Sequence, residues 1–210
     1  PPAPKEVRPK ADRIGFIAGS LHNTARRFIT VASLYHALLA LFYTSNASND
    51  DAIISRLCPR PENLSADLFT WSPITITCLT SMLLGAAIRL SAYGGLGKSF
   101  TFYLATPEKL VTSGIYRFMQ HPSYTGFVLL SVPGLWLTFG WKSSVACFID
   151  GSTLSLFHGR EVMASMALVA GLSFFIGLRV RDEEKMLREK FGDEWVAWHK
   201  KTKRFIPGVF

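Results

Sequence analysis

The sequence has little charge and little cysteine for a chain of 210 residues. Charged residues make up 18% of it, whereas a soluble domain is typically about a quarter charged. The three cysteines are far apart and include no CxxC pair, so neither a disulfide framework nor a zinc site is predicted. The five histidines suggest no metal-ligand set, and we predict no metal. These shortages argue against an ordinary soluble domain, a disulfide scaffold and a metalloprotein.

The chain also lacks an initial methionine and a charged-then-apolar leader pattern, since it opens PPAPKEVRPKADR. This beginning is typical of a processed or trimmed start, so we expect elements upstream of it.

Apolar residues are abundant: 49% of the chain is hydrophobic and its mean hydropathy is +0.22. A bilayer crossing needs roughly 17–25 predominantly apolar residues. Three stretches reach that length, and a fourth is shorter and contains His36. We predict an all-α integral membrane protein with four transmembrane helices, and a fifth if residues 14–27 or an upstream segment contribute. The four stretches are 28–43, 73–93, 124–141 and 162–180.

Basic residues predict the orientation in the membrane. Of the 23 Lys and Arg residues, 18 fall in residues 1–27, 94–123 and 179–210. Cytoplasmic segments carry such an excess, so both ends and the 94–123 loop are predicted to face the cytosol. In a membrane protein this excess does not indicate nucleic-acid binding, and we predict none. The lipid bilayer is the expected surrounding.

The last thirty residues predict a cytosolic amphipathic helix at the membrane surface. Gly192 is expected to break this helix. The apolar face consists of Leu187, Phe191, Trp195 and Trp198. The basic residues expected near anionic headgroups are Lys200, Lys201, Lys203 and Arg204.

Two clusters of ionisable residues border the apolar stretches, where charge is costly and usually functional. One is LVTSGIYRFMQHPSYTG at 110–126, and the other is RVRDEE at 179–184. Their pattern, LVxxGxYxxxxHPxYxG followed by RxxxEE, FGxEW and a terminal Pro, resembles the isoprenylcysteine carboxyl methyltransferases. The resemblance covers residues 95–207. One departure is Gln120, where the family usually has Arg.

This resemblance implies a multi-pass enzyme of the endoplasmic reticulum membrane with its active site facing the cytosol. It implies S-adenosylmethionine (SAM) as cofactor and prenylated CaaX proteins or peptides as substrates. The reaction would be methylation of the C-terminal carboxylate of S-prenylcysteine. Residues 1–93 would form an N-terminal segment with two membrane helices, and residues 94–210 the catalytic region with a cytosolic cofactor pocket.

The resemblance also implies residue roles. Arg179 would be catalytic and would hold the substrate carboxylate. Glu183, with Glu184 beside it, would bind the amino group of SAM. Of these two glutamates, only Glu183 would also be catalytic. The turn that would contact the adenosine part, largely through backbone groups, is Glu108, Lys109, Leu110 and Val111. The residues that would line the cofactor are Tyr116, His121, Pro122, Ser123 and Tyr124.

The residue chemistry agrees with these roles independently. A carboxylate is already a nucleophile at neutral pH, so methyl transfer to it needs positioning rather than a base. The planar guanidinium of Arg179 suits a carboxylate, and Glu183 suits an ammonium group. The two lie four residues apart and share a helix face. Pro122 fits the first turn of a helix and leaves backbone donors there for an anionic group.

Each residue alone also has a structural interpretation. Arg179 is a typical positive-inside anchor, and His121 a typical interfacial histidine. Glu184 would form an ordinary i,i+4 pair with Arg188 on a solvated helix. Only the joint spacing favours a site.

Three other functions stay open. Phospholipid (phosphatidylethanolamine) N-methyltransferases look similar around HPxYxG and the paired glutamates, but an amine acceptor would need a base. NADPH-dependent sterol reductases end with similar segments but are usually longer. A non-catalytic membrane scaffold would keep the motif without activity.

Overall fold

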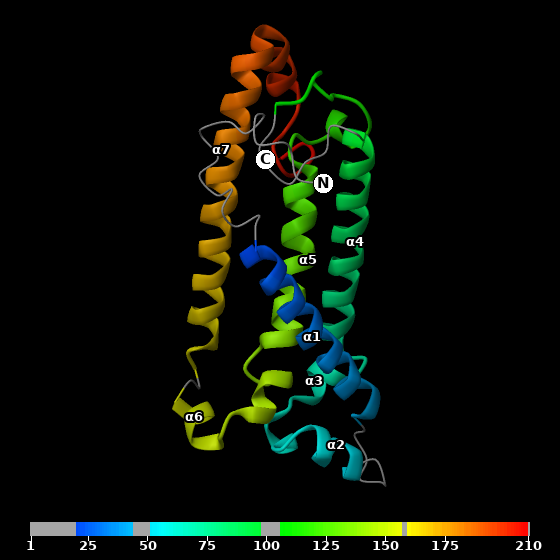
Figure 1. Ribbon diagram of the computed structural model, residues 1–210, viewed down its shortest axis with the longest axis vertical. Coiled ribbons are helices and arrows are strands. Elements are labelled where there is room, and N and C mark those ends of the chain that lie inside the picture. Colours follow the sequence, from blue (N-terminus) through cyan, green and yellow to red (C-terminus); the bar gives the residue numbers. More distant parts are fainter. Residues whose placement is uncertain (1–19, 44–50, 98–105, 157–158, 210) are drawn as a thin grey trace. The chain divides into compact units, whose positions relative to one another are not determined.

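The computed structural model describes residues 20–43, 51–97, 106–156 and 159–209 (Figure 1). Most of these residues are helical and none lies in a β-strand, which confirms the all-α prediction for this part of the chain. The α-helices are α1 (Ser20–Phe42), α2 (Asp51–Leu57), α3 (Ala66–Phe69), α4 (Pro73–Leu96), α5 (Pro122–Phe139), α6 (Gly151–Leu156) and α7 (Glu161–Lys201). The 3-10 helices are η3 (Pro61–Asn63), η5 (Gly114–Arg117) and η6 (Ser144–Phe148).

Within the described ranges, three helical segments are long and apolar enough to cross a membrane: Asn23–Phe42, Ala66–Leu96 and Glu161–Lys201. They contain most of the first predicted stretch and all of the second and fourth. The third predicted stretch forms most of α5, which has 18 residues and is not among the three. The fifth span predicted from residues 14–27 lies largely outside the described residues.

The chain divides into two compact units, each built from separated segments. The first unit contains residues 84–128 and 170–210, and the second contains 25–83 and 129–169. The division predicted between residues 93 and 94 stays a prediction.

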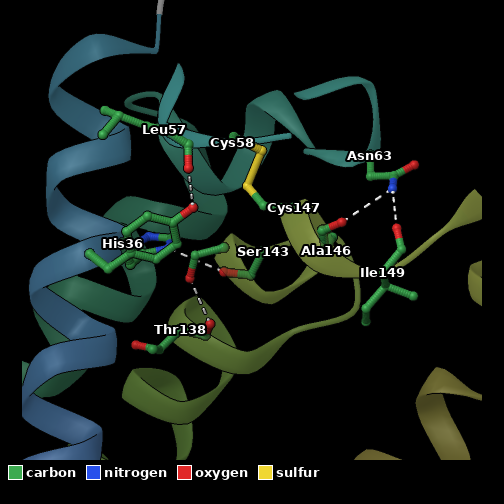
Figure 2. Close-up of a disulfide and its surroundings, with 11 residues drawn as sticks. His36, Leu57, Cys58, Asn63, Thr138, Ser143, Ala146, Cys147 and Ile149 are labelled. Atoms are coloured by element: carbon green, nitrogen blue, oxygen red, sulfur yellow. Dashed lines mark hydrogen bonds between the residues drawn. A yellow bond between two sulfur atoms is a disulfide. The ribbon is translucent and has the colours of Figure 1, made fainter. Parts of the chain in front are cut away.

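A disulfide between Cys58 and Cys147 connects two loops of the second unit (Figure 2). The two cysteines are 89 residues apart in the sequence, and both are fully buried. Cysteine spacing gave no indication of this bond, so the expectation of no disulfide was wrong. The bond lies in a buried cluster formed by Leu39, Ile54, Cys58, Leu68, Phe69, Leu137 and Cys147.

Polar side chains hold the same loops together (Figure 2). Asn63 Nδ2 donates hydrogen bonds to the carbonyls of Ala146 and Ile149, at 3.2 and 2.9 Å. The Tyr35 hydroxyl donates to the Leu57 carbonyl at 2.9 Å. These carbonyls lie at the end of α2 and in and just after η6, where short helices leave backbone acceptors without intrahelical donors, and the side chains supply the missing donors.

A hydrogen bond within the second unit explains how Pro133 is accommodated inside α5. Proline has no N–H, so the carbonyl of Leu129, four residues earlier, lacks its helical donor. The Ser81 hydroxyl of α4 donates to that carbonyl at 3.0 Å. A neighbouring helix therefore satisfies the backbone group that the proline leaves free, as is common in membrane helices.

In the first unit, α4 and α5 approach closely at Gly126, the last residue of the HPSYTG sequence. A Cβ at this position would lie 2.6 Å from the Gly85 carbonyl oxygen and 2.7 Å from Arg89 Cγ. Arg89 Nη1 in turn donates to the Ser123 carbonyl at 3.2 Å. The glycine is therefore required by helix packing, and the packing fixes where α5 begins.

Replacing Gly126 by Ala is expected to destabilise the protein by about 1–3 kcal/mol, because a backbone carbonyl cannot move away as a side chain can. Thermal unfolding of the purified protein in detergent measures this. Gly171→Ala in α7 is the matched control, since nothing lies within 4 Å of a Cβ there. Equal unfolding midpoints for the two variants would contradict the close packing.

Candidate active site

The segment before α5 begins the site. Gly114 opens η5 with a φ of 60°, a conformation that favours glycine. This turn buries Tyr116, whose hydroxyl donates to the Ala92 carbonyl of α4 at 3.3 Å. Burial raises the pKa of Tyr116, and the nearby Glu183 charge raises it further. Tyr116 therefore stays protonated at neutral pH and acts as a donor.

Helix α7 provides the other side of the site and continues well past its apolar stretch. Gly192 interrupts it with φ 50° and ψ −120°, as the sequence predicted. Of the predicted apolar face, Leu187 and Trp195 are buried. The amphipathic face is thus used for packing within the first unit.

After α7 the chain returns to the start of α5 (Figure 1). The backbone N–H groups of Gln120 and His121 donate to the carbonyls of Lys203 and Arg204, at 2.8 and 2.9 Å. The Thr125 hydroxyl donates to the Phe205 carbonyl at 2.9 Å. The C-terminal segment is therefore attached to the HPSYTG turn and to the residue before it, and it occupies the backbone donors of His121 and Gln120.

Glu183 is at the centre of the predicted residues. The Tyr124 hydroxyl donates to Glu183 Oε2 at 3.0 Å. The Arg179 side chain, one helical turn earlier on α7, also interacts with that hydroxyl. Glu183 keeps 30% of its side chain exposed, so its carboxylate is accessible. The structure brings these three predicted residues together.

Glu184 points to different partners. Arg204 donates to both of its carboxylate oxygens, from Nε at 2.6 Å and from Nη2 at 3.0 Å. His121 Nε2 lies 3.3 Å from Oε1 of the same carboxylate. This bidentate pairing raises the pKa of Arg204, because it favours the charged guanidinium. Glu184 therefore pairs with Arg204, twenty residues away, and not with Arg188 as its spacing suggested.

His121 contains a polar atom with no hydrogen-bond partner among the described residues. Its side chain is 3% exposed, and Nδ1 lies 3.8 Å from Glu183 Oε2 without a hydrogen bond. A buried polar atom left unpaired costs about 1–3 kcal/mol. A polar group bound beside Glu183 would remove this cost.

Both polar atoms of the Gln120 side chain form hydrogen bonds with residues at the end of α7. Its Nε2 donates to the carbonyls of His199 and Thr202, and its Oε1 lies 2.8 Å from His199 Nδ1. Helix C-termini leave carbonyls without partners, and this amide satisfies two of them. The neutral side chain at this position therefore joins the HPSYTG turn to the C-terminal segment.

The predicted adenosine turn lies in a bend ahead of η5, with Glu108 and Lys109 exposed and Leu110 and Val111 half-buried. Lys190 Nζ of α7 donates to the Pro107 carbonyl at 2.6 Å and so ties this bend to the helix. Trp198 Nε1 of α7 donates to the Tyr116 carbonyl at 3.1 Å and so connects η5 to the same helix.

The structure therefore groups Arg179, Glu183, Tyr124 and His121, with Tyr116 and Glu184 at the edges of the group. Pro122 is the first residue of α5, as predicted. Sequence reasoning missed the supporting residues Arg204, His199 and Lys190. Their partners lie 20 to 83 residues away, so no local pattern pointed to them.

Replacing Arg204 by Gln is expected to loosen the C-terminal segment by about 1–2 kcal/mol, because Glu184 loses a bidentate partner that is partly exposed to solvent. Hydrogen exchange should report this at the Gln120 and His121 amides, whose acceptors are in that segment, as roughly tenfold faster exchange. Lys201→Gln removes a neighbouring exposed charge and serves as the control. Unchanged exchange in Arg204→Gln would show that the ion pair does not hold the segment.

The described residues combine three helical segments of membrane length with a polar group, Arg179, Glu183 and Glu184, at the end of the apolar part of α7. This combination is typical of a membrane protein. The model of the isoprenylcysteine carboxyl methyltransferase (ICMT) family matches residues 76–160. This range includes the turn 108–111 and the HPSYTG sequence, whereas Arg179 and Glu183 lie beyond it.

Individual relatives extend the similarity. The chain is 29% identical over 135 residues to protein-S-isoprenylcysteine O-methyltransferase B of Arabidopsis thaliana, which covers 62% of this chain and 58% of that protein. It is 30% identical over 133 residues to the Dictyostelium discoideum protein-S-isoprenylcysteine O-methyltransferase, covering 61% and 47%. To the Homo sapiens protein of that name it is 23% identical over 144 residues, which cover 67% of this chain and 43% of that protein. The chain thus spans about half the length of the curated relatives it matches. The resemblance found in the sequence is confirmed, and the chain is related to the isoprenylcysteine carboxyl methyltransferases.

Proposed function

We propose that this protein transfers a methyl group from SAM to the C-terminal carboxylate of an S-prenylcysteine on processed CaaX proteins. The observation that carries the proposal is the grouping of Arg179 and Glu183, at the end of the apolar part of α7, with Tyr124 of α5. An arginine and a carboxylate one helical turn apart can hold an anionic acceptor and a cationic donor side by side.

The residues present fit SAM as the methyl donor. Glu183 offers an accessible carboxylate for the ammonium group, and the unpaired Nδ1 of His121 lies beside it. Both oxygens of Glu184 already have partners, so we assign it to positioning His121 and the C-terminal segment. Tyr116, Tyr124 and the bend at 108–111 would complete the pocket.

When bound, SAM supplies a methyl group already activated on a sulfonium. The chain's own residues then need only bind and orient. Arg179 would hold the substrate carboxylate with its planar fork, and Glu183 would hold the ammonium group of SAM beside it. Transfer of the methyl group to a carboxylate oxygen would leave the electron pair on sulfur and would require no proton transfer from the chain. Catalysis therefore rests on alignment and exclusion of water rather than on a general base.

We further propose that α1, α4, α5 and the apolar part of α7 are four membrane spans. An acceptor with a prenyl tail explains the membrane location, since about 15 buried carbons at roughly 0.8 kcal/mol each keep the tail in the bilayer. The site residues at the start of α5 and after the apolar part of α7 then lie at the same membrane face.

We propose that this face is the cytosolic side of the endoplasmic reticulum membrane. The distribution of Lys and Arg supports it, and the disulfide adds independent support. Cys58 and Cys147 lie in the two loops assigned to the opposite face, where an oxidising lumen preserves disulfides. In sealed microsomes of a Cys78→Ser variant that also carries Glu62→Cys, an exposed position in one of these loops, an impermeant maleimide should label the new cysteine only after detergent is added. Labelling without detergent would overturn the orientation.

The activity is tested by transfer of radiolabelled methyl from SAM to N-acetyl-S-farnesylcysteine in membranes containing the protein. Base-labile label on the farnesylcysteine is the expected result. Phosphatidylethanolamine is the parallel acceptor, and label on it alone would make the protein an N-methyltransferase. No label on either acceptor would contradict a methyltransferase function.

A further inference from the structure

The C-terminal segment, residues 200–209, combines two kinds of surface. Residues 196–209 contain four cations and no acidic residue. The apolar side chains of Ile206 and Val209 are 51% and 71% exposed. Cations beside exposed apolar residues are typical of a segment that lies in a membrane interface.

The contacts of this segment place it level with the first turn of α5. Its carbonyls accept the backbone N–H groups of Gln120 and His121, which precede the first helical residue, Pro122. The apolar residues of α5 begin a few positions later. If α5 crosses the bilayer, as the proposed function requires, the segment lies at headgroup depth.

A cavity of about 210 Å³ opens at the same place. Its walls include the buried side chains of Gln120 and Thr202 and the exposed side chains of Lys200 and Lys203. Arg204 also lines the cavity, but its guanidinium is bound to Glu184. Neither lysine forms an ion pair within the described part of the chain. The cavity has room for a phosphate-sized anion, and its two lysines supply the positive charges that would bind it.

We propose that this cavity binds the phosphate of an anionic phospholipid headgroup through Lys200 and Lys203, while Ile206 and Val209 contact the acyl region. Charge complementarity selects an anionic headgroup, and the adjacent apolar residues select a lipid over a soluble anion. The bound lipid stabilises the C-terminal segment, which holds Glu184 through Arg204 and the HPSYTG turn through Gln120.

The test counts lipids retained by the purified full chain in native mass spectrometry, with phosphatidylglycerol as the anionic lipid and phosphatidylcholine as the neutral one. We expect Lys200→Gln/Lys203→Gln to weaken phosphatidylglycerol binding roughly 25-fold, about fivefold per lysine. The matched control, Lys185→Gln/Lys201→Gln, removes the same charge from exposed positions outside the cavity lining. We expect it to change binding less than threefold.

Equal losses in the two double variants would show a diffuse charge effect and overturn the site. Unchanged binding in Lys200→Gln/Lys203→Gln would overturn it as well. If glycerophosphoglycerol, the headgroup without acyl chains, binds as tightly as the lipid, the cavity takes a soluble anion and the lipid assignment is wrong. None of these measurements requires methyl transfer, so this proposal and the proposed function fail separately.

Discussion

Replacing Arg179 by Ala is expected to lower kcat/KM for N-acetyl-S-farnesylcysteine by roughly 100- to 1000-fold while leaving the affinity for SAM within about twofold. The reason is that a substrate carboxylate would lose a charged partner in a poorly solvated site, at a cost of about 3–4 kcal/mol. The cofactor's ammonium group is assigned to Glu183, so its binding does not depend on this charge. Steady-state methylation assays and binding of S-adenosylhomocysteine measure the two effects separately.

Two further variants sharpen the Arg179 prediction. Arg179→Lys keeps the positive charge but loses the planar fork, so we expect an intermediate loss. Arg181→Ala removes an exposed arginine two residues further along α7 and should keep full activity. If Arg179→Ala weakened SAM binding and methylation equally, Arg179 would belong to the cofactor site instead.

Replacing Glu183 by Gln is expected to weaken binding of SAM and of S-adenosylhomocysteine by about fiftyfold, or ~2–3 kcal/mol, because the ammonium loses its carboxylate. Glutamine still accepts the hydrogen bond that Tyr124 donates at 3.0 Å, so the local geometry should persist. Calorimetric titration with S-adenosylhomocysteine, which has the same amino group and no reactive methyl, measures the effect directly.

Two other carboxylates serve as comparisons for Glu183. Glu189→Gln changes an exposed glutamate paired with Lys185 and should leave cofactor affinity unchanged. Glu184→Gln should act on the C-terminal segment, whose Arg204 it binds, and affect cofactor affinity less than Glu183→Gln does. A larger loss of affinity in Glu184→Gln would reverse the roles assigned to the two glutamates.

Local features of the chain were predictable. The apolar run at 162–180 forms part of α7, Pro122 begins α5 and Gly192 interrupts α7. Each of these depends on properties of a few neighbouring residues, namely hydropathy, a missing N–H and an allowed backbone conformation. The third apolar stretch was predicted at 124–141, whereas α5 runs from Pro122 to Phe139 and includes Pro133.

Long-range partners were not predictable. Glu184 could pair with Arg188 by its spacing, but the returning C-terminal segment brings Arg204 to it instead. Cys58 forms a disulfide with Cys147, 89 residues away, and Gln120 forms a hydrogen bond with His199, 79 residues away. No pattern within one helix indicates which distant residue will arrive beside it.

The sequence by itself indicated the apolar segments of membrane length, the helical class and the two motifs whose spacing is typical of a methyltransferase, because hydropathy and helical periodicity are local properties. The grouping of Arg179 and Glu183 on one face was equally local, since they are four residues apart. Only the tertiary structure decided that Glu183 is accessible and Glu184 is occupied, because their difference depends on where residues 202–205 return. That return is fixed by the break at Gly192 and by backbone hydrogen bonds to the HPSYTG turn.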